Sequence, residues 1–180
     1  AGLYDEYAKV YTGFAEYKLA LEYYQKSLKI RLQVHGESHR DVGTSYNNIA
    51  AVLDSRGNYD QALEYYQQSL KIWLNIHGES HPDVGPSYNN ISVVLKSQGK
   101  YDQALEYYHK SLKIYLQVHG ESHPAVGTSY NNIGRVLQNQ GKYNKALEYL
   151  EKSLKIRLQV HGESHPDVGG CYNDIAGVLA

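Results

Sequence analysis

The sequence has 180 residues, a formal net charge of −1 and a pI near 6.8, so it lacks the strongly basic character typical of nucleic-acid-binding surfaces. No apolar stretch approaches the roughly 20 residues that a membrane-spanning helix requires. Composition therefore predicts neither a nucleic-acid partner nor a membrane partner. Tyr is abundant, with 19 residues against one Phe and one Trp, so we expect a core rich in aromatic rings whose hydroxyls need polar partners.

The expected location is cytoplasmic. The sequence opens without the charged and apolar segments of a secretory signal. Its one cysteine, Cys171, cannot form an internal disulfide, which fits a reducing compartment.

The string His-Gly-Glu-Ser-His recurs every 42 residues, and the two units that start at Gly43 and Gly85 share 30 of their 42 residues. Such a fixed period is the signature of a repeat protein. We predict one array with a degenerate first repeat over residues 1–42, full repeats over 43–84, 85–126 and 127–168, and a truncated fifth repeat over 169–180.

Each unit is predicted to form two helices. In the third unit the second helix spans about 101–118, because its apolar residues recur at spacings of three and four. Those residues are Tyr101, Ala104, Leu105, Tyr108, Leu112, Tyr115 and Leu116. The first helix places Tyr88, Ile91, Ser92 and Leu95 on one face and ends at Gly99.

The loops between units carry helix signals. Gly36, Gly78, Gly120 and Gly162 should end the second helices, because Gly tolerates the conformation that follows a helix. Ser80 with Asp83, and Ser164 with Asp167, have the spacing of a capping box at the next helix.

Small residues recur where helices must approach each other closely, at Ala50, Ser92 and Gly134. A single helix pair of this length is marginal in water, whereas stacked pairs bury a continuous core. The predicted fold is therefore an all-α solenoid of stacked helix pairs.

These residues resemble the tetratricopeptide repeat signature, which in the third unit is formed by Tyr88, Ile91, Ser92, Leu95, Gly99, Tyr101, Ala104 and Tyr108. The usual unit has 34 residues. The longer unit, the His-Gly-Glu-Ser-His loop and the Tyr-Asn-Asn-Ile run are similar to the kinesin light chain subclass. The resemblance implies a right-handed superhelix of antiparallel helix pairs that scaffolds protein–protein interactions, with no catalysis and no cofactor.

The first unit departs from this pattern. Ala15 stands where later units have Gly at the turn between helices, with Gly13 two residues earlier. We interpret this unit as a degenerate capping helix. A helix that continues through the turn is the alternative, and it would favour exchange of segments between chains.

The resemblance also implies that first helices line a concave groove that binds an extended peptide. Positions 5 and 6 of the units supply Asn residues, whose amides can match a peptide backbone. The alternative is that they bond only to a neighbour's backbone or to water. These candidates are Asn47, Asn89 and Asn131 at position 5, and Asn48, Asn90 and Asn132 at position 6.

Specificity is expected from positions that differ between units. Position 9 includes Val93 and Arg135, and position 12 includes Lys96 and Gln138. The two cations would suit an acidic ligand and Val93 an apolar one. The alternative is that these side chains are simply solvated.

The sequence also suggests functions other than peptide binding. A self-associating rod is the main alternative, because Ile175, Val178 and Leu179 of the truncated repeat need a cover. Paired histidines such as His77 and His81 suggest a metal loop, but two rings separated by a helix end need not converge, so we predict no metal. Cys171 replaces a repeated Ser, which indicates packing and not nucleophilic catalysis.

Overall fold

The computed structural model describes residues 1–179, which form nine α-helices and no β-strand. They are α1 (Gly2–Gly13), α2 (Tyr17–His35), α3 (Arg40–Ser55), α4 (Tyr59–His77), α5 (Val84–Ser97), α6 (Tyr101–His119), α7 (Pro124–Asn139), α8 (Tyr143–His161) and α9 (Pro166–Leu179). The all-α prediction is confirmed. None of the described helices is long and apolar enough to cross a membrane.

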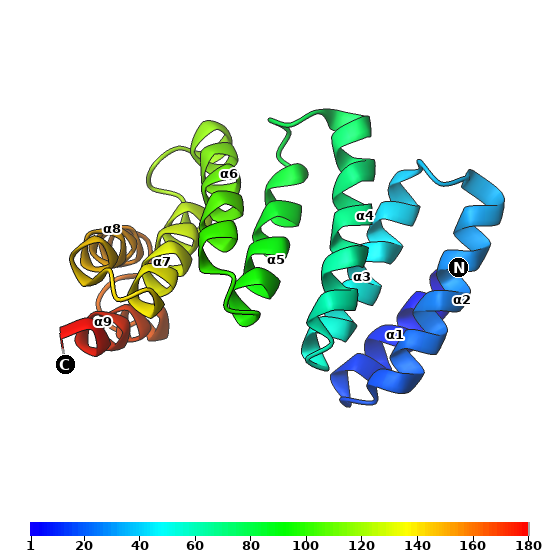
Figure 1. Ribbon diagram of the computed structural model, residues 1–180, viewed down its shortest axis with the longest axis horizontal. Coiled ribbons are helices and arrows are strands. Elements are labelled where there is room, and N and C mark those ends of the chain that lie inside the picture. Colours follow the sequence, from blue (N-terminus) through cyan, green and yellow to red (C-terminus); the bar gives the residue numbers. More distant parts are fainter. Residues whose placement is uncertain (180) are drawn as a thin grey trace. The chain divides into compact units, whose positions relative to one another are not determined.

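The helices form two compact units, Ala1–Gln98 with α1 to α5 and Gly99–Ala180 with α6 to α9. Within each unit, helices that follow one another in the chain pack side by side in antiparallel fashion (Figure 1). The four second helices α2, α4, α6 and α8 all have 19 residues and all end at the first His of the loop. The following Gly has φ of 77° or 78°, a conformation that L residues rarely adopt, which confirms it as the stop signal.

The turn in the first repeat is not a continuous helix. α1 ends at Gly13, and Ala15 has φ of 59°, where Gly57, Gly99 and Gly141 have similar positive values in later repeats. A left-handed Ala costs about 1–2 kcal/mol, so the surrounding packing imposes this turn against local preference. The alternative of an uninterrupted helix is therefore wrong for the described residues.

The predicted packing face of the first helix is confirmed in α5, where Tyr88, Ile91, Ser92 and Leu95 are all buried. Val94 is also buried, although the periodicity did not single it out.

Close approach at the small position is also confirmed. Ala50 and Ser92 are fully buried, and a Cβ added to Gly134 would lie 2.8 Å from Leu150 Cγ. The equivalent of Leu150 in α4 is Tyr66, so the glycine and the branched Leu occur together in α7 and α8.

The capping box is wrong for Ser80 and Asp83, because α5 begins at Val84 and its N-cap residue, Asp83, forms no side-chain cap hydrogen bond. At the start of α9 the N–H of Asp167 bonds to His165 Nδ1. Histidine, not Ser, caps α3 and α7: His39 Nδ1 accepts a hydrogen bond from Asp41 N, and His123 Nδ1 accepts one from Ala125 N, both at 3.2 Å. The second His of the loop lies one residue closer to the helix than Ser, and its ring reaches the free N–H groups of the first turn. The second His of these two loops therefore contributes to the cap of the next helix.

Candidate peptide-binding surface

The predicted site residues all lie on the first helices α3, α5 and α7. Most are half-buried, as expected of groove positions, whereas Asn131 is buried and Arg135 is exposed. The half-buried ones are Asn47, Asn48, Asn89, Asn90, Asn132, Val93, Lys96 and Gln138.

The structure brings position 5 of one repeat to position 6 of the next. Asn90 Nδ2 donates a hydrogen bond of 3.0 Å to Asn47 Oδ1 within the first unit. In the second unit Asn131 Nδ2 donates one of 2.6 Å to Asp174 Oδ2. The Asn rows therefore bond side chain to side chain along the stack, whereas the alternative from sequence was a bond to a neighbour's backbone or to water. In the first pair this bonding leaves part of each amide open.

In the first pair, Asn47 and Asn90, each side-chain amide keeps one atom without a partner among residues 1–179. Within the described residues, Asn47 Nδ2 and Asn90 Oδ1 have no hydrogen-bond partner. A primary amide offers two donor hydrogens and an acceptor with two lone pairs. The pair thus presents a donor and an acceptor side by side, which is the pattern that an extended peptide backbone requires.

The variable positions also interact along the stack. Burial raises the pKa of the Asp54 carboxyl, and the charge of Lys96 opposes that shift. Arg135 Nε lies 3.8 Å from Asp174 Oδ1, and Gln138 Nε2 donates a 2.8 Å hydrogen bond to the Gly177 carbonyl. Both predicted cations therefore have an acidic neighbour within their own unit, which lowers their net attraction for an acidic ligand.

A cavity of about 260 Å³ lies beside the first Asn pair. It is smaller than the roughly 300–1,000 Å³ of small-molecule sites, so it suits a single side chain of a larger partner. Its lining is formed by Arg40, Thr44, Asn47, Trp73, Asp83, Pro86, Ser87 and Asn90.

Comparison with known proteins identifies the family. The model of the tetratricopeptide repeat matches residues 1–75, 41–117, 83–159 and 126–180. The chain belongs to the tetratricopeptide repeat (TPR) family. Proteins of this family are generally non-catalytic scaffolds for protein–protein interaction. Among curated proteins, none matches the chain in sequence.

Solved structures agree with this assignment. BtubC (BKLC) from P. vanneervenii has a TM-score of 0.86 and 26% identity, over 96% of this chain and 68% of that chain. Two structures of a putative kinesin light chain with nearly identical TPR-like repeats from Podosopora anserina have TM-scores of 0.85 and 0.84. Their identities are 19% and 20%, over 98% of this chain and 83% of theirs, and at that level the likeness shows the fold alone.

Trp73 and Arg40 are cavity residues that the sequence reasoning missed. Trp73 is residue 31 of its TPR unit, on a second helix, whereas candidates were sought on first helices. The sequence did contain a signal for this position, because its residue type differs between repeats that are otherwise nearly identical. The position is occupied by Arg31, Trp73, Tyr115 and Arg157. A residue near the end of a second helix reaches the cavity since the next first helix begins directly after the loop.

A second type of cavity occurs in both units. One of about 250 Å³ is lined by Glu37, Ser38, Tyr46, Gln68, Lys71, Ile72 and Asn75. The other, of about 370 Å³, is lined by Glu121, Ser122, Tyr130, Lys152, Lys155, Ile156 and Gln159. Every lining residue of one is equivalent to a lining residue of the other, so the cavity follows from TPR packing and not from one specialised site.

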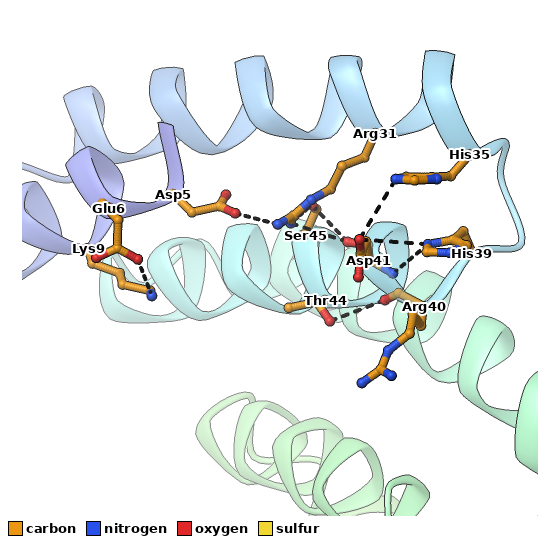
Figure 2. A network of polar contacts seen from close by, with 10 residues as sticks. All are labelled: Asp5, Glu6, Lys9, Arg31, His35, His39, Arg40, Asp41, Thr44 and Ser45. Carbon is orange, nitrogen blue, oxygen red and sulfur yellow. Dashed lines mark hydrogen bonds and ion pairs between the residues drawn. The ribbon is translucent and has the colours of Figure 1, made fainter. Parts of the chain in front are cut away.

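The paired histidines do converge, contrary to the sequence expectation. Their rings stack with centroids 4.0–4.2 Å apart in all four loops, as His35 and His39 show in Figure 2. In three loops an Asp adds a third potential ligand atom within 4.8 Å, whereas Ala125 replaces it in the other loop.

This geometry favours a structural role for the TPR loop. The nitrogen lone pairs of a histidine lie in the plane of its ring. In two stacked rings these lone pairs point in parallel planes and do not converge on one metal ion. The Nδ1 atom of the second ring already accepts a backbone N–H, as in His81 and His165, so a cation at that atom would displace the cap.

The remaining chemical candidates are packed or solvated. Cys171 is fully buried with its Sγ 3.6 Å from Ser153 Oγ, which agrees with its interpretation as a packed residue. The acids Glu64 and Glu106, which occupy the same position in two repeats, are exposed on second helices.

Proposed function

We propose that this TPR chain is a scaffold that holds an extended segment of a partner protein along its first helices. The observation that carries the proposal is the Asn47–Asn90 pair, whose open donor and acceptor lie at the edge of a cavity beside Trp73. Backbone recognition by the amides and insertion of one side chain into the cavity would bind a segment without any cofactor.

Equivalent positions extend this surface within each unit. In the first unit Asn48, Asn89 and Val93 continue it on α3 and α5. In the second unit Asn131, Asn132 and Gln138 form the equivalent surface on α7. Lys96 and Arg135 add positive charge that Asp54 and Asp174 partly balance. The expected partner segment is therefore mixed in character, with an apolar or aromatic anchor and few acids. Its cytoplasmic setting, without nucleic acid or membrane, stays a prediction.

The test is a random peptide display library screened against the chain and against an Asn47→Ala/Asn90→Ala variant. We expect enriched peptides to bind the chain and to lose about tenfold or more in affinity for the variant, because the free donor and the free acceptor that this pair offers to a peptide backbone disappear. Asn75→Ala is the matched control, since it removes an exposed amide of the same unit that lines the other type of cavity.

The outcomes separate the possible sites. Loss of binding in the double variant and in no control supports the first-helix surface. Loss in the control alone would move the site to the other cavity and contradict the proposal. An enriched acidic peptide that binds equally well after Arg135→Glu would exclude Arg135 from recognition.

Self-association is the second candidate. It is favoured by large exposed apolar side chains on α1 and α9: Leu3 is 67% exposed and Leu179 is 69% exposed. Phe14, at 75%, adjoins α1. Light scattering as a function of concentration tests it, and a monomer at all concentrations would remove this candidate.

A further inference from the structure

Two arginines occupy the same position in the first and fourth repeats but differ in their partners. Arg31, on α2, lies between three acceptors (Figure 2). Its Nη2 bonds to Asp5 Oδ2 at 2.5 Å, and its Nη1 donates to Ser45 Oγ at 2.6 Å and to the Asp41 carbonyl at 3.3 Å. With side-chain exposures of 15% for Arg31 and 10% for Asp5, the first repeat holds a carboxylate of its own chain at this guanidinium.

Arg157, on α8, keeps one of these contacts. Its Nη1 donates to the Asp167 carbonyl at 3.0 Å, the equivalent of the bond from Arg31 to Asp41, so the guanidinium is anchored in the same way. The residue equivalent to Ser45 is Cys171, whose sulfur contacts Ser153. The residue equivalent to Asp5 is Asn131, three periods of 42 later.

The carboxylate that contacts Asn131 is already engaged. Asp174 accepts the Asn131 amide at 2.6 Å through Oδ2, and its Oδ1 faces Arg135 Nε at 3.8 Å. Within the described residues, the Arg157 side chain has one hydrogen-bond partner, the backbone carbonyl of Asp167. It is half-buried, so four of its five N–H donors remain available to a ligand.

We propose that Arg157 binds a carboxylate of the partner, in the place that Asp5 occupies at Arg31. This inference rests on the proposed function, and it adds a specific recognition element: an Asp or Glu side chain of the bound segment, or its terminal carboxylate. A planar guanidinium binds either source by paired hydrogen bonds. The anchored Nη1 and half-buried setting pre-organise the group and reduce its entropy cost.

The first experiment uses sodium acetate as the probe, with NMR of the arginine Nε–Hε groups at constant ionic strength set by chloride. We expect the Arg157 signal to shift and to saturate, with a shift at least threefold larger than that of exposed Arg56. The Arg31 signal should stay unchanged because Asp5 occupies it. A linear Arg157 response equal to that of Arg56 overturns the proposal.

Reciprocal variants exchange the behaviour of the two sites. Asp5→Asn removes the internal carboxylate, so the Arg31 signal should now respond to acetate. The charge-conserving exchange Asn131→Asp/Asp174→Asn supplies Arg157 with an internal carboxylate and keeps a hydrogen bond between the two residues. It should abolish the acetate response of Arg157, and a response that persists contradicts the proposed geometry.

Peptides then identify the source of the carboxylate. Amidated peptides from the display screen that contain an acid should lose about tenfold in affinity for Arg157→Gln. Lys145→Gln is the matched control, because it removes an equal charge from an exposed site on the same helix. Loss confined to peptides with a free C-terminus would assign the terminal carboxylate.

The two proposals fail in distinguishable ways. Acetate binding at Arg157 without any enriched peptide would contradict the proposed function and leave the anion site standing. Enriched peptides that require Asn47 and Asn90, with neither an acetate response nor an effect of Arg157→Gln, would contradict the anion site alone.

Discussion

The first and fourth repeats have the same helix pair and the same arginine position, yet one neighbouring residue gives that arginine a different role. In the first repeat Asp5 neutralises Arg31 in a half-closed site, whereas Asn131 stands in the equivalent place beside Arg157. The TPR frame therefore survives a change of chemistry at this arginine position, because the residues that pack the helices and the residues that vary lie at different positions of the repeat.

The largest expected effect concerns this arginine position. Arg31→Met should destabilise the first unit by about 3–5 kcal/mol, because it leaves the buried Asp5 carboxylate without a partner. Arg157→Met should cost less than about 1 kcal/mol, since that side chain is half-buried and makes one neutral contact. Urea denaturation of both variants measures the difference, and equal losses would mean that the two sites are alike.

The small position of the first helix provides the next comparison. Ser92→Leu should destabilise the chain by about 1–3 kcal/mol, because the added methyl groups have no space in a fully buried site. The measurement is a denaturant midpoint. The control is Ser97→Leu on the exposed side of the same helix, and an unchanged midpoint for Ser92→Leu would contradict the packing register.

Gly134→Ala should have a smaller net cost of about 1 kcal/mol. Its Cβ would lie 2.8 Å from Leu150 Cγ and 3.2 Å from the Ala146 carbonyl, and the gain in helix propensity offsets part of the overpacking. The double variant Gly134→Ala/Leu150→Tyr restores the combination found at Ala50 and Tyr66. A double-mutant cycle should show recovery, and additive losses would show that Leu150 is not the obstacle.

The histidine cap should contribute about 0.5–1 kcal/mol, the lower part of the range for capping side chains. His123→Ala removes the acceptor for Ala125 N, whereas His123→Asn replaces it with another good cap. Thermal melts should therefore separate the two variants. Equal melting temperatures would mean that the histidine acts through ring stacking on His119 alone.

The smallest effect is expected at Asp54, where burial raises the pKa of the carboxyl in the folded state. The folded state thus binds a proton more readily than the unfolded state, so stability from this group falls as pH rises through its pKa. Asp54→Asn should raise the melting temperature at pH 7, where the carboxyl is charged, and should raise it less at pH 3, where the carboxyl is protonated. Removal of the Lys96 contact reduces the gain, and a gain independent of pH would contradict the assignment.

Much of this molecule follows from local sequence. The 42-residue period, the Gly stop signals and the buried face of α5 were predictable because each depends on spacing along one helix or on backbone conformations that favour Gly. The left-handed Ala15 was not, since isolated residues of this type avoid positive φ. Packing between α1 and α2 imposes that turn.

Site chemistry divides in the same way. Sequence alone determined that the first helices carry rows of Asn and that repeats differ at a few positions, because these are properties of a periodic pattern. Tertiary structure decided that Asn47 pairs with Asn90, that Trp73 lines their cavity, and that Asp5 occupies Arg31 while Arg157 keeps open donors. Those contacts join residues about half a repeat to a full repeat apart, and their partners depend on how helices stack, which no local pattern encodes.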